Sequence, residues 1–183
     1  MPRLNEQTPE RAEGPVGEIY RQVKEKMGGV PNIFTGMANS PAALRGYLSL
    51  SEALAGGELD ECDREALYLA VSEGNGCDYC VSAHTMLAKG VGLSEDETLR
   101  VRQFGSDDER RSALLAFAKK VIETKGFVAD GDLATVREAG YTDGQIVETI
   151  GYIALATFSN FLNHVHATEL DFPEASPLAS RVT

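Results

Sequence analysis

Apolar residues in this chain recur every three or four positions, as they do on one face of an amphipathic helix. The segment that follows Asp60 shows this most clearly, with apolar residues at positions 62, 66, 67, 69, 70 and 71. No good run of alternating apolar and polar residues, the pattern of a half-buried strand, stands between turn signals. The pattern therefore predicts an all-α fold.

Turn and capping residues predict where these helices begin and end. Pro15 suits the first turn of a helix, and the glycines at 28–29 end it. Ser94 followed by Glu97 predicts a capping box. Residues 30–34 are expected to form a connector that buries Ile33 and Phe34. Helices are predicted at about 15–27, 41–55, 60–73, 77–89, 94–104, 107–125, 130–139 and 142–168.

Length and composition favour one globular domain over residues 1–183. The chain has 183 residues, of which 43% are hydrophobic and 25% charged, which is ordinary for a soluble domain. The core is expected at about 14–173, with the N-terminal segment and the acidic tail at 171–183 as arms. The net charge of −11 argues against nucleic acid and an anionic membrane surface as partners.

The chain is expected to be a cytoplasmic protein without a membrane span. Its N-terminus lacks the apolar region of a secretory signal. The longest apolar stretch, 150–162, is short and is interrupted by Thr157, Ser159 and Asn160. In the cytoplasm, its three cysteines are expected to be reduced, reactive or metal-binding.

The segment at 73–84, EGNGCDYCVSAH, carries the most chemical information. At the start of a helix, Cys77, Cys80 and His84 would share one face. A helix N-terminus, with Asn75 or Gly76 as its cap, and a nearby base would lower the pKa of a thiol there. Cys80 is then the better nucleophile, His84 can accept its proton, and Cys77 can resolve the oxidised sulfur.

Glu65 is a further candidate, in the helix that precedes the cysteines. It lies at the edge of an apolar stripe, so partial burial would raise its pKa and suit it to proton transfer. If the two helices form a hairpin, Glu65 could approach His84. The alternative is a solvated acid paired with a lysine or arginine.

The spacing Glu65-x11-Cys77-x2-Cys80-x3-His84 resembles the signature of the AhpD-like alkylhydroperoxidases, in the carboxymuconolactone decarboxylase superfamily. The segments GGVPNIFTGMANSPAALRGYL and NFLNHVHATELDFP are similar to the peroxidase-related branch of that family. The resemblance covers about residues 14–173. It implies an all-α multi-helix domain whose active site is a helix hairpin.

The resemblance also implies roles and partners. Cys80 would attack a small hydroperoxide, Cys77 would close a disulfide, and His84 backed by Glu65 would relay the proton. No cofactor is implied; an external dithiol, of the lipoyl type or from another thiol protein, would reduce the disulfide. Family members assemble as dimers, trimers or hexamers, so a homo-oligomer is expected. AhpD itself has a histidine where this chain has Tyr79. The reaction rate and the reductant of AhpD therefore need not apply to this chain.

Other interpretations remain open at this point. A redox sensor or a disulfide-exchange protein would use the same two thiols. The two cysteines, His84 and Glu65 could instead supply four zinc ligands. Lactone decarboxylation is disfavoured, because the superfamily's decarboxylases lack the cysteine pair. Outside the signature, Cys62, His164 and His166 are interpreted as structural.

Overall fold

The computed structural model describes residues 1–178, and this part of the chain is all-α, with nine helices and no strand. The predicted fold class is therefore confirmed. Within the same residues, none of the helices is both long and apolar enough to span a bilayer. The helices are α1 (Gly14–Met27), α2 (Asn32–Met37), α3 (Pro41–Ala55), α4 (Glu61–Gly74), α5 (Asp78–Gly90), α6 (Glu95–Val101), α7 (Glu109–Thr124), α8 (Asp130–Glu138) and α9 (Asp143–His166).

The predicted helices all form, with ends within three residues of those expected, and two local predictions need correction. The connector at 30–34 continues into a short helix, α2, although Ile33 and Phe34 are buried as expected. The capping box of α6 is only half formed. Ser94 accepts the N–H of Glu97, but the Glu97 carboxylate accepts hydrogen bonds from Ser106 and Asp107 instead.

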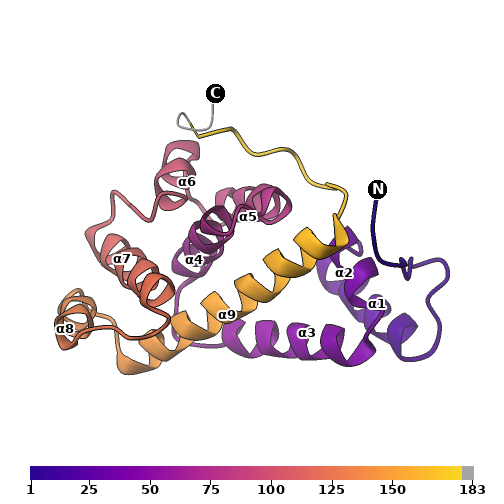
Figure 1. Cartoon of the computed structure of the whole chain (residues 1–183), viewed down its shortest axis with the longest axis horizontal. Coiled ribbons are helices and arrows are strands. Elements are labelled where there is room, and N and C mark those ends of the chain that lie inside the picture. Colours follow the sequence, from indigo (N-terminus) through magenta and orange to yellow (C-terminus); the bar gives the residue numbers. More distant parts are fainter. Residues whose placement is uncertain (179–183) are drawn as a thin grey trace.

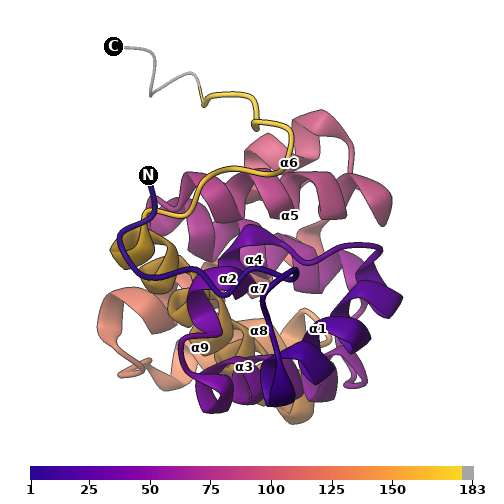
Figure 2. The ribbon, with the colours of Figure 1, turned by 90° about the vertical axis from the view of Figure 1, so that its right-hand side faces the viewer.

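The helix hairpin of α4 and α5 lies in the middle of the molecule (Figure 1). The long helix α9 crosses it and packs against both members of the hairpin and against α2 and α3. Helices α1–α3 flank the hairpin on one side and α6–α8 on the other (Figures 1 and 2). Residues that come from α2, α3 and α9 can therefore reach the turn between α4 and α5.

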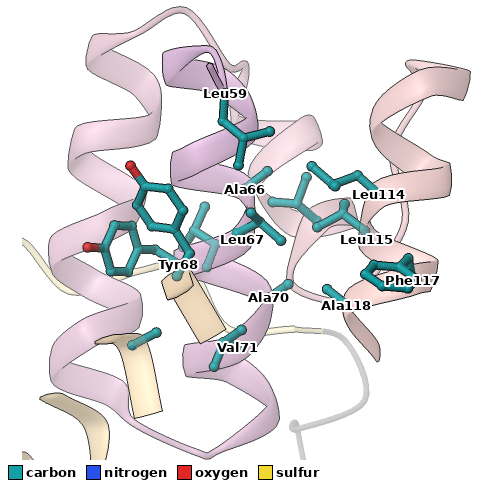
Figure 3. Packing of buried hydrophobic residues seen from close by; sticks show 14 of the residues in the cluster. Leu59, Ala66, Leu67, Tyr68, Ala70, Val71, Leu114, Leu115, Phe117 and Ala118 are labelled. Atoms are coloured by element: carbon teal, nitrogen blue, oxygen red, sulfur yellow. The ribbon is translucent and has the colours of Figure 1, made fainter. Parts of the chain in front are cut away.

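The larger of two apolar clusters fixes α4 against α7. Leu67 of α4 lies beside Leu114 and Leu115 of α7, and Ala70 lies beside Ala118 (Figure 3); all five are fully buried. Each such leucine contributes about 2 kcal/mol by leaving water. Tyr68 points to the opposite side of α4 (Figure 3), where the second cluster joins α1–α3 to the start of α5 and includes both Cys77 and Cys80.

A buried carboxylate also holds α4 in place. Asp63 is 1% exposed and accepts hydrogen bonds from Arg111 Nε at 3.0 Å, Arg110 at 3.2 Å and the Tyr141 hydroxyl at 2.8 Å. The guanidinium of Arg110 also lies 3.8 Å from the centre of the Tyr141 ring. This network ties α4 to α7 and to the turn that precedes α9.

Removing this carboxylate is expected to destabilise the fold strongly. Asp63→Ala removes the acceptor of the buried Tyr141 hydroxyl and the closer carboxylate partner of the half-buried Arg111, which costs about 3 kcal/mol of unfolding free energy. Urea denaturation measures the loss. The control is Asp143→Ala, which breaks an exposed ion pair with Arg137 and should cost less than about 1 kcal/mol. Equal losses in the two variants would contradict this assignment.

The two terminal segments pack on the helical body. At the N-terminus, the Arg3 N–H donates to the His166 carbonyl and the Gln7 N–H to the Thr35 carbonyl. In the predicted C-terminal arm, the Ala175 N–H donates to Ser82 of α5 at 3.2 Å. Residues 171–178 thus lie against α5 and α6, as Figure 1 also shows, whereas the remaining arm residues, 179–183, lie outside the described part.

Candidate functional site

The turn between α4 and α5 places Cys77 at the N-terminal cap of α5. Gly76 adopts a φ of 71°, which glycine reaches without strain. The chain then reverses, and the Cys77 N–H bonds the Ser72 carbonyl at 2.9 Å. Cys77 Sγ accepts the N–H of Cys80 at 3.3 Å. The cap expected at Asn75 or Gly76 is therefore the cysteine itself.

The two sulfurs lie next to each other as free thiols. Cys77 Sγ and Cys80 Sγ are 2.7 Å apart, beyond the disulfide bond length of about 2.05 Å. Both residues are buried, with exposures of 1% and 3%. The short separation means that a disulfide needs little movement of the backbone.

The two thiols differ in acidity. The hydrogen bond from Cys77 lowers the pKa of Cys80 to about 6; burial opposes this shift, and the charge of His84 adds to it. Donating that hydrogen bond, together with burial, raises the pKa of Cys77. The thiolate near pH 7 therefore belongs to Cys80, while Cys77 keeps its proton.

His84 forms a buried pair with Glu65. Its Nδ1 lies 2.8 Å from Glu65 Oε2, and the two side chains are only 15% and 16% exposed. Burial opposes a charged imidazole, but the charge and hydrogen bond of Glu65 and the charge of Cys80 raise the pKa of His84. Because a carboxylate only accepts, Nδ1 carries the proton and Nε2 is the nitrogen left for chemistry.

The surroundings of this pair rule out the surface-acid interpretation of Glu65. Its hydrogen-bond partner is His84, which comes from the other helix of the hairpin. The Tyr68 ring stacks on the imidazole with centroids 4.1 Å apart and planes at 11°. The stacking and the hydrogen bond together fix the orientation of His84.

Cys80, His84 and Glu65 line one cavity of about 210 Å³. Its other walls are mainly apolar and aromatic and come from α1–α5, from Ser159 of α9 and from the C-terminal arm; they include Met27, Ile33, Phe34, Tyr47, Leu48 and Phe172. Cys77 is not among the lining residues. A substrate in this cavity would meet the sulfur of Cys80 first.

Tyr79 also lines the cavity, but its hydroxyl is used elsewhere. The oxygen accepts the N–H of Ile33 at 3.3 Å, and the edge of the ring meets Phe172 with centroids 5.5 Å apart. Burial raises the pKa of the phenol, which therefore stays neutral. Tyr79 acts as a wall of the site between α2 and the C-terminal arm.

Two asparagines of α9, which sequence reasoning missed, complete the site. Asn163 Nδ2 lies 3.1 Å from Cys80 Sγ and 3.7 Å from Cys77 Sγ. Asn160 is fully buried and donates to Ser72 Oγ at 3.1 Å. Both amides lower the pKa of Cys80. The sequence signal that points to them is the occurrence of amide side chains inside an otherwise apolar helix.

The remaining candidates lie outside this cavity. Cys62 is half-buried and donates to the Val91 carbonyl at 3.4 Å, and burial raises its pKa. His164 is exposed, with Nε2 3.3 Å from the Gly76 carbonyl. His166 is fully buried and accepts the Leu4 N–H. These contacts agree with the structural interpretation of the three residues.

The four residues considered as alternative zinc ligands are not assembled as a metal site. Within residues 1–178, no group of three or more histidine, cysteine, aspartate or glutamate side chains is arranged to hold a metal ion. Glu65 instead approaches His84 at hydrogen-bond distance. The geometry therefore gives no support to the zinc-binding alternative.

Comparison with known proteins shows which family and which solved structures the chain resembles. The model of the carboxymuconolactone decarboxylase family matches residues 41–120, which include all four signature residues. A crystal structure of an alkylhydroperoxidase AhpD core, from an uncharacterized peroxidase-related protein of Ralstonia eutropha JMP134, superposes with a TM-score of 0.84 and 26% identity. It covers 93% of this chain and 92% of that one. Residues 41–120 are therefore a carboxymuconolactone decarboxylase family domain, and the chain has an AhpD-like fold.

Other relatives of this AhpD-like chain are more distant or only partly matched. Alkyl hydroperoxide reductase Rv2159c of Mycobacterium tuberculosis (strain ATCC 25618 / H37Rv) is 30% identical over 88 residues. That match spans 48% of the AhpD-like chain but only 26% of the curated relative. The debrominase Bmp8 shares the fold with a TM-score of 0.74, covering 92% of each chain at 19% identity.

Proposed function

We propose that this protein is a thiol-dependent peroxidase that reduces hydrogen peroxide or small alkyl hydroperoxides. The observation that carries the proposal is that Cys80 and the His84–Glu65 pair line one mainly apolar cavity. The sulfur of Cys77 lies 2.7 Å from the sulfur of Cys80. The AhpD-like and peroxidase-related relatives support a peroxide-reducing function. The superfamily also includes decarboxylases, so the activity itself needs a direct test.

In the proposed cycle, the Cys80 thiolate attacks the terminal oxygen of the hydroperoxide. The O–O bond breaks, the alcohol (or water, from hydrogen peroxide) leaves with a proton from His84, and Cys80 becomes a sulfenic acid. The Cys77 thiol then attacks the Cys80 sulfur, which forms the disulfide and releases water. An external dithiol, of the lipoyl type or carried by another protein, returns two electrons and restores both thiols.

A single-turnover experiment tests this cycle. Reduced protein is mixed with one equivalent of hydrogen peroxide or an alkyl hydroperoxide in a stopped-flow instrument, and thiols are then counted. The count should fall from three to one per chain, because Cys62 does not take part. With excess dihydrolipoamide, the protein should turn over repeatedly. One oxidation without turnover would favour a redox sensor, and no oxidation faster than that of free cysteine would refute the peroxidase.

We further propose that the expected homo-oligomer assembles through the outward face of α9. Exposed apolar side chains form a row along this helix, and in Figure 1 no other helix lies in front of α9. Positions 147 and 165, like 154 and 158, are equally distant from residue 156, so an antiparallel second copy centred there would place the small Ala154 against the large Phe158. The members of the row are Val147, Ile150, Ala154, Phe158, Phe161 and Val165, all of them exposed.

A charge in this row is expected to break the assembly. Phe161 is 54% exposed, and Phe161→Glu would place like charges in the shared interface and lower the molar mass measured by light scattering to that of one chain. Phe127, at 88% exposure, lies outside the row, so Phe127→Glu should leave the mass unchanged. A wild-type protein that is already monomeric, or a Phe161→Glu variant with unchanged mass, would reject the interface.

A further inference from the structure

Asn163 is the side chain that reaches both thiols from outside the α4–α5 hairpin. Its Nδ2 lies 3.1 Å from Cys80 Sγ and 3.7 Å from Cys77 Sγ, and the residue is only 4% exposed. A thiolate buried at this depth loses its hydration, so it needs donors from the protein. The hydroxyl of Tyr79, the neighbour of Cys80 in sequence, faces Ile33 instead.

The orientation of the Asn163 amide is fixed by Thr168. The Thr168 hydroxyl donates to Asn163 Oδ1 at 2.6 Å, so the oxygen of the amide is occupied and its NH₂ group faces the sulfurs. Helix α9 ends at His166, and Ala167 after it adopts a left-handed φ of 54°. This turns the chain back so that the Thr168 N–H also bonds the Asn163 carbonyl at 3.3 Å. This strained turn keeps Thr168 beside the amide.

We propose that Asn163 is a catalytic residue, whose fixed amide donates to the Cys80 thiolate before attack and to the sulfenate oxygen after it. The inference rests on the proposed role of Cys80 as the nucleophile. An amide is neutral at every working pH, so its contribution does not vanish when His84 loses its proton. Because the amide reaches both sulfurs, it can also stabilise whichever thiolate leaves when an external dithiol opens the disulfide.

The thiolate titration of Cys80 tests this role without any peroxide. In a Cys62→Ser background, absorbance at 240 nm and the rate of alkylation by iodoacetamide are followed against pH. Asn163→Leu keeps the approximate volume and removes the donor. The apparent pKa of Cys80 should rise by at least one unit, which is a tenfold loss of thiolate below that pKa. Thr168→Val, which only frees the amide to rotate, should shift the pKa in the same direction by less.

Asn39→Leu is the matched control, since the Asn39 amide donates to the backbone carbonyls of Asn5 and Gly36 and to neither sulfur. Its titration should match the wild type. An unchanged Cys80 pKa in Asn163→Leu with a native circular dichroism spectrum would overturn the proposal. If that variant does not fold, an unchanged pKa in Thr168→Val would overturn it as well. A protein that shows the shift but does not reduce hydroperoxides would refute the peroxidase and leave the thiolate contact standing.

Discussion

Cys80→Ser is expected to lower the rate of peroxide reduction by at least about a thousandfold, because a serine hydroxyl is not ionised at neutral pH. The rate is measured as the second-order constant for hydroperoxide consumption in stopped flow, with dihydrolipoamide as reductant. Cys80 is the thiol that lines the cavity and the one whose pKa is lowered. Activity that survives in Cys80→Ser would refute the proposed nucleophile.

Substitutions of Cys77 should separate its two roles. Cys77→Ser keeps a hydrogen-bond donor beside Cys80, so the first oxidation should remain within about tenfold of the wild-type rate and stop at a sulfenic acid, detectable by mass spectrometry. Cys77→Ala removes the donor, which is the largest cause of the lowered Cys80 pKa, and should slow the first step further. Repeated turnover should be lost in both variants.

Cys62→Ser is the matched control for these variants. It changes the third thiol of the chain, which donates to the Val91 carbonyl and has a raised pKa. Its peroxide kinetics should equal those of the wild type. A fall in its rate comparable to that of Cys80→Ser would mean that the oxidised thiol has been assigned wrongly.

Much of the helical fold could be predicted because its signals are local. Apolar spacing and turn glycines give the helices, and the EGNGCDYCVSAH segment gives the hairpin chemistry. The N-terminal end of α5 shows the limit of such local signals. A cysteine is an unusual helix cap, so Asn75 and Gly76 were better candidates than Cys77, whose sulfur does the capping.

The contribution of α9 to the site could not be predicted from local signals. Asn163 lies 83 residues from Cys80 in sequence, and the two meet only because α9 crosses the hairpin. The same is true of the cavity walls, which α1–α3 and the C-terminal arm supply. Hydrophobic spacing shows that a residue faces a core, but it does not show which helix lies opposite.

Glu65→Gln is expected to lower the rate of peroxide reduction at pH 7 by about a hundredfold, through the protonation of His84. In the wild type, the raised pKa of His84 and the lowered pKa of Cys80 leave an imidazolium beside a thiolate. The rate should rise as Cys80 loses its proton near pH 6 and fall at higher pH, as His84 loses its own. The enzyme is therefore expected to be most active at pH values between the deprotonation of Cys80 and that of His84.

The neutral amide of Glu65→Gln removes the charge that raises the pKa of His84, while burial still lowers that pKa. The alkaline fall should therefore move to lower pH. Since the charge of His84 helps to lower the pKa of Cys80, the acidic rise should move to higher pH, and the pH range of highest activity narrows from both sides. The second-order rate constant, measured from pH 5 to 9, gives this pH profile.

The control is Glu61→Gln, one turn earlier on α4. Its side chain is 71% exposed, so this variant should keep the wild-type pH profile. If Glu65→Gln gave that same profile, Glu65 would hold His84 in place without setting its charge.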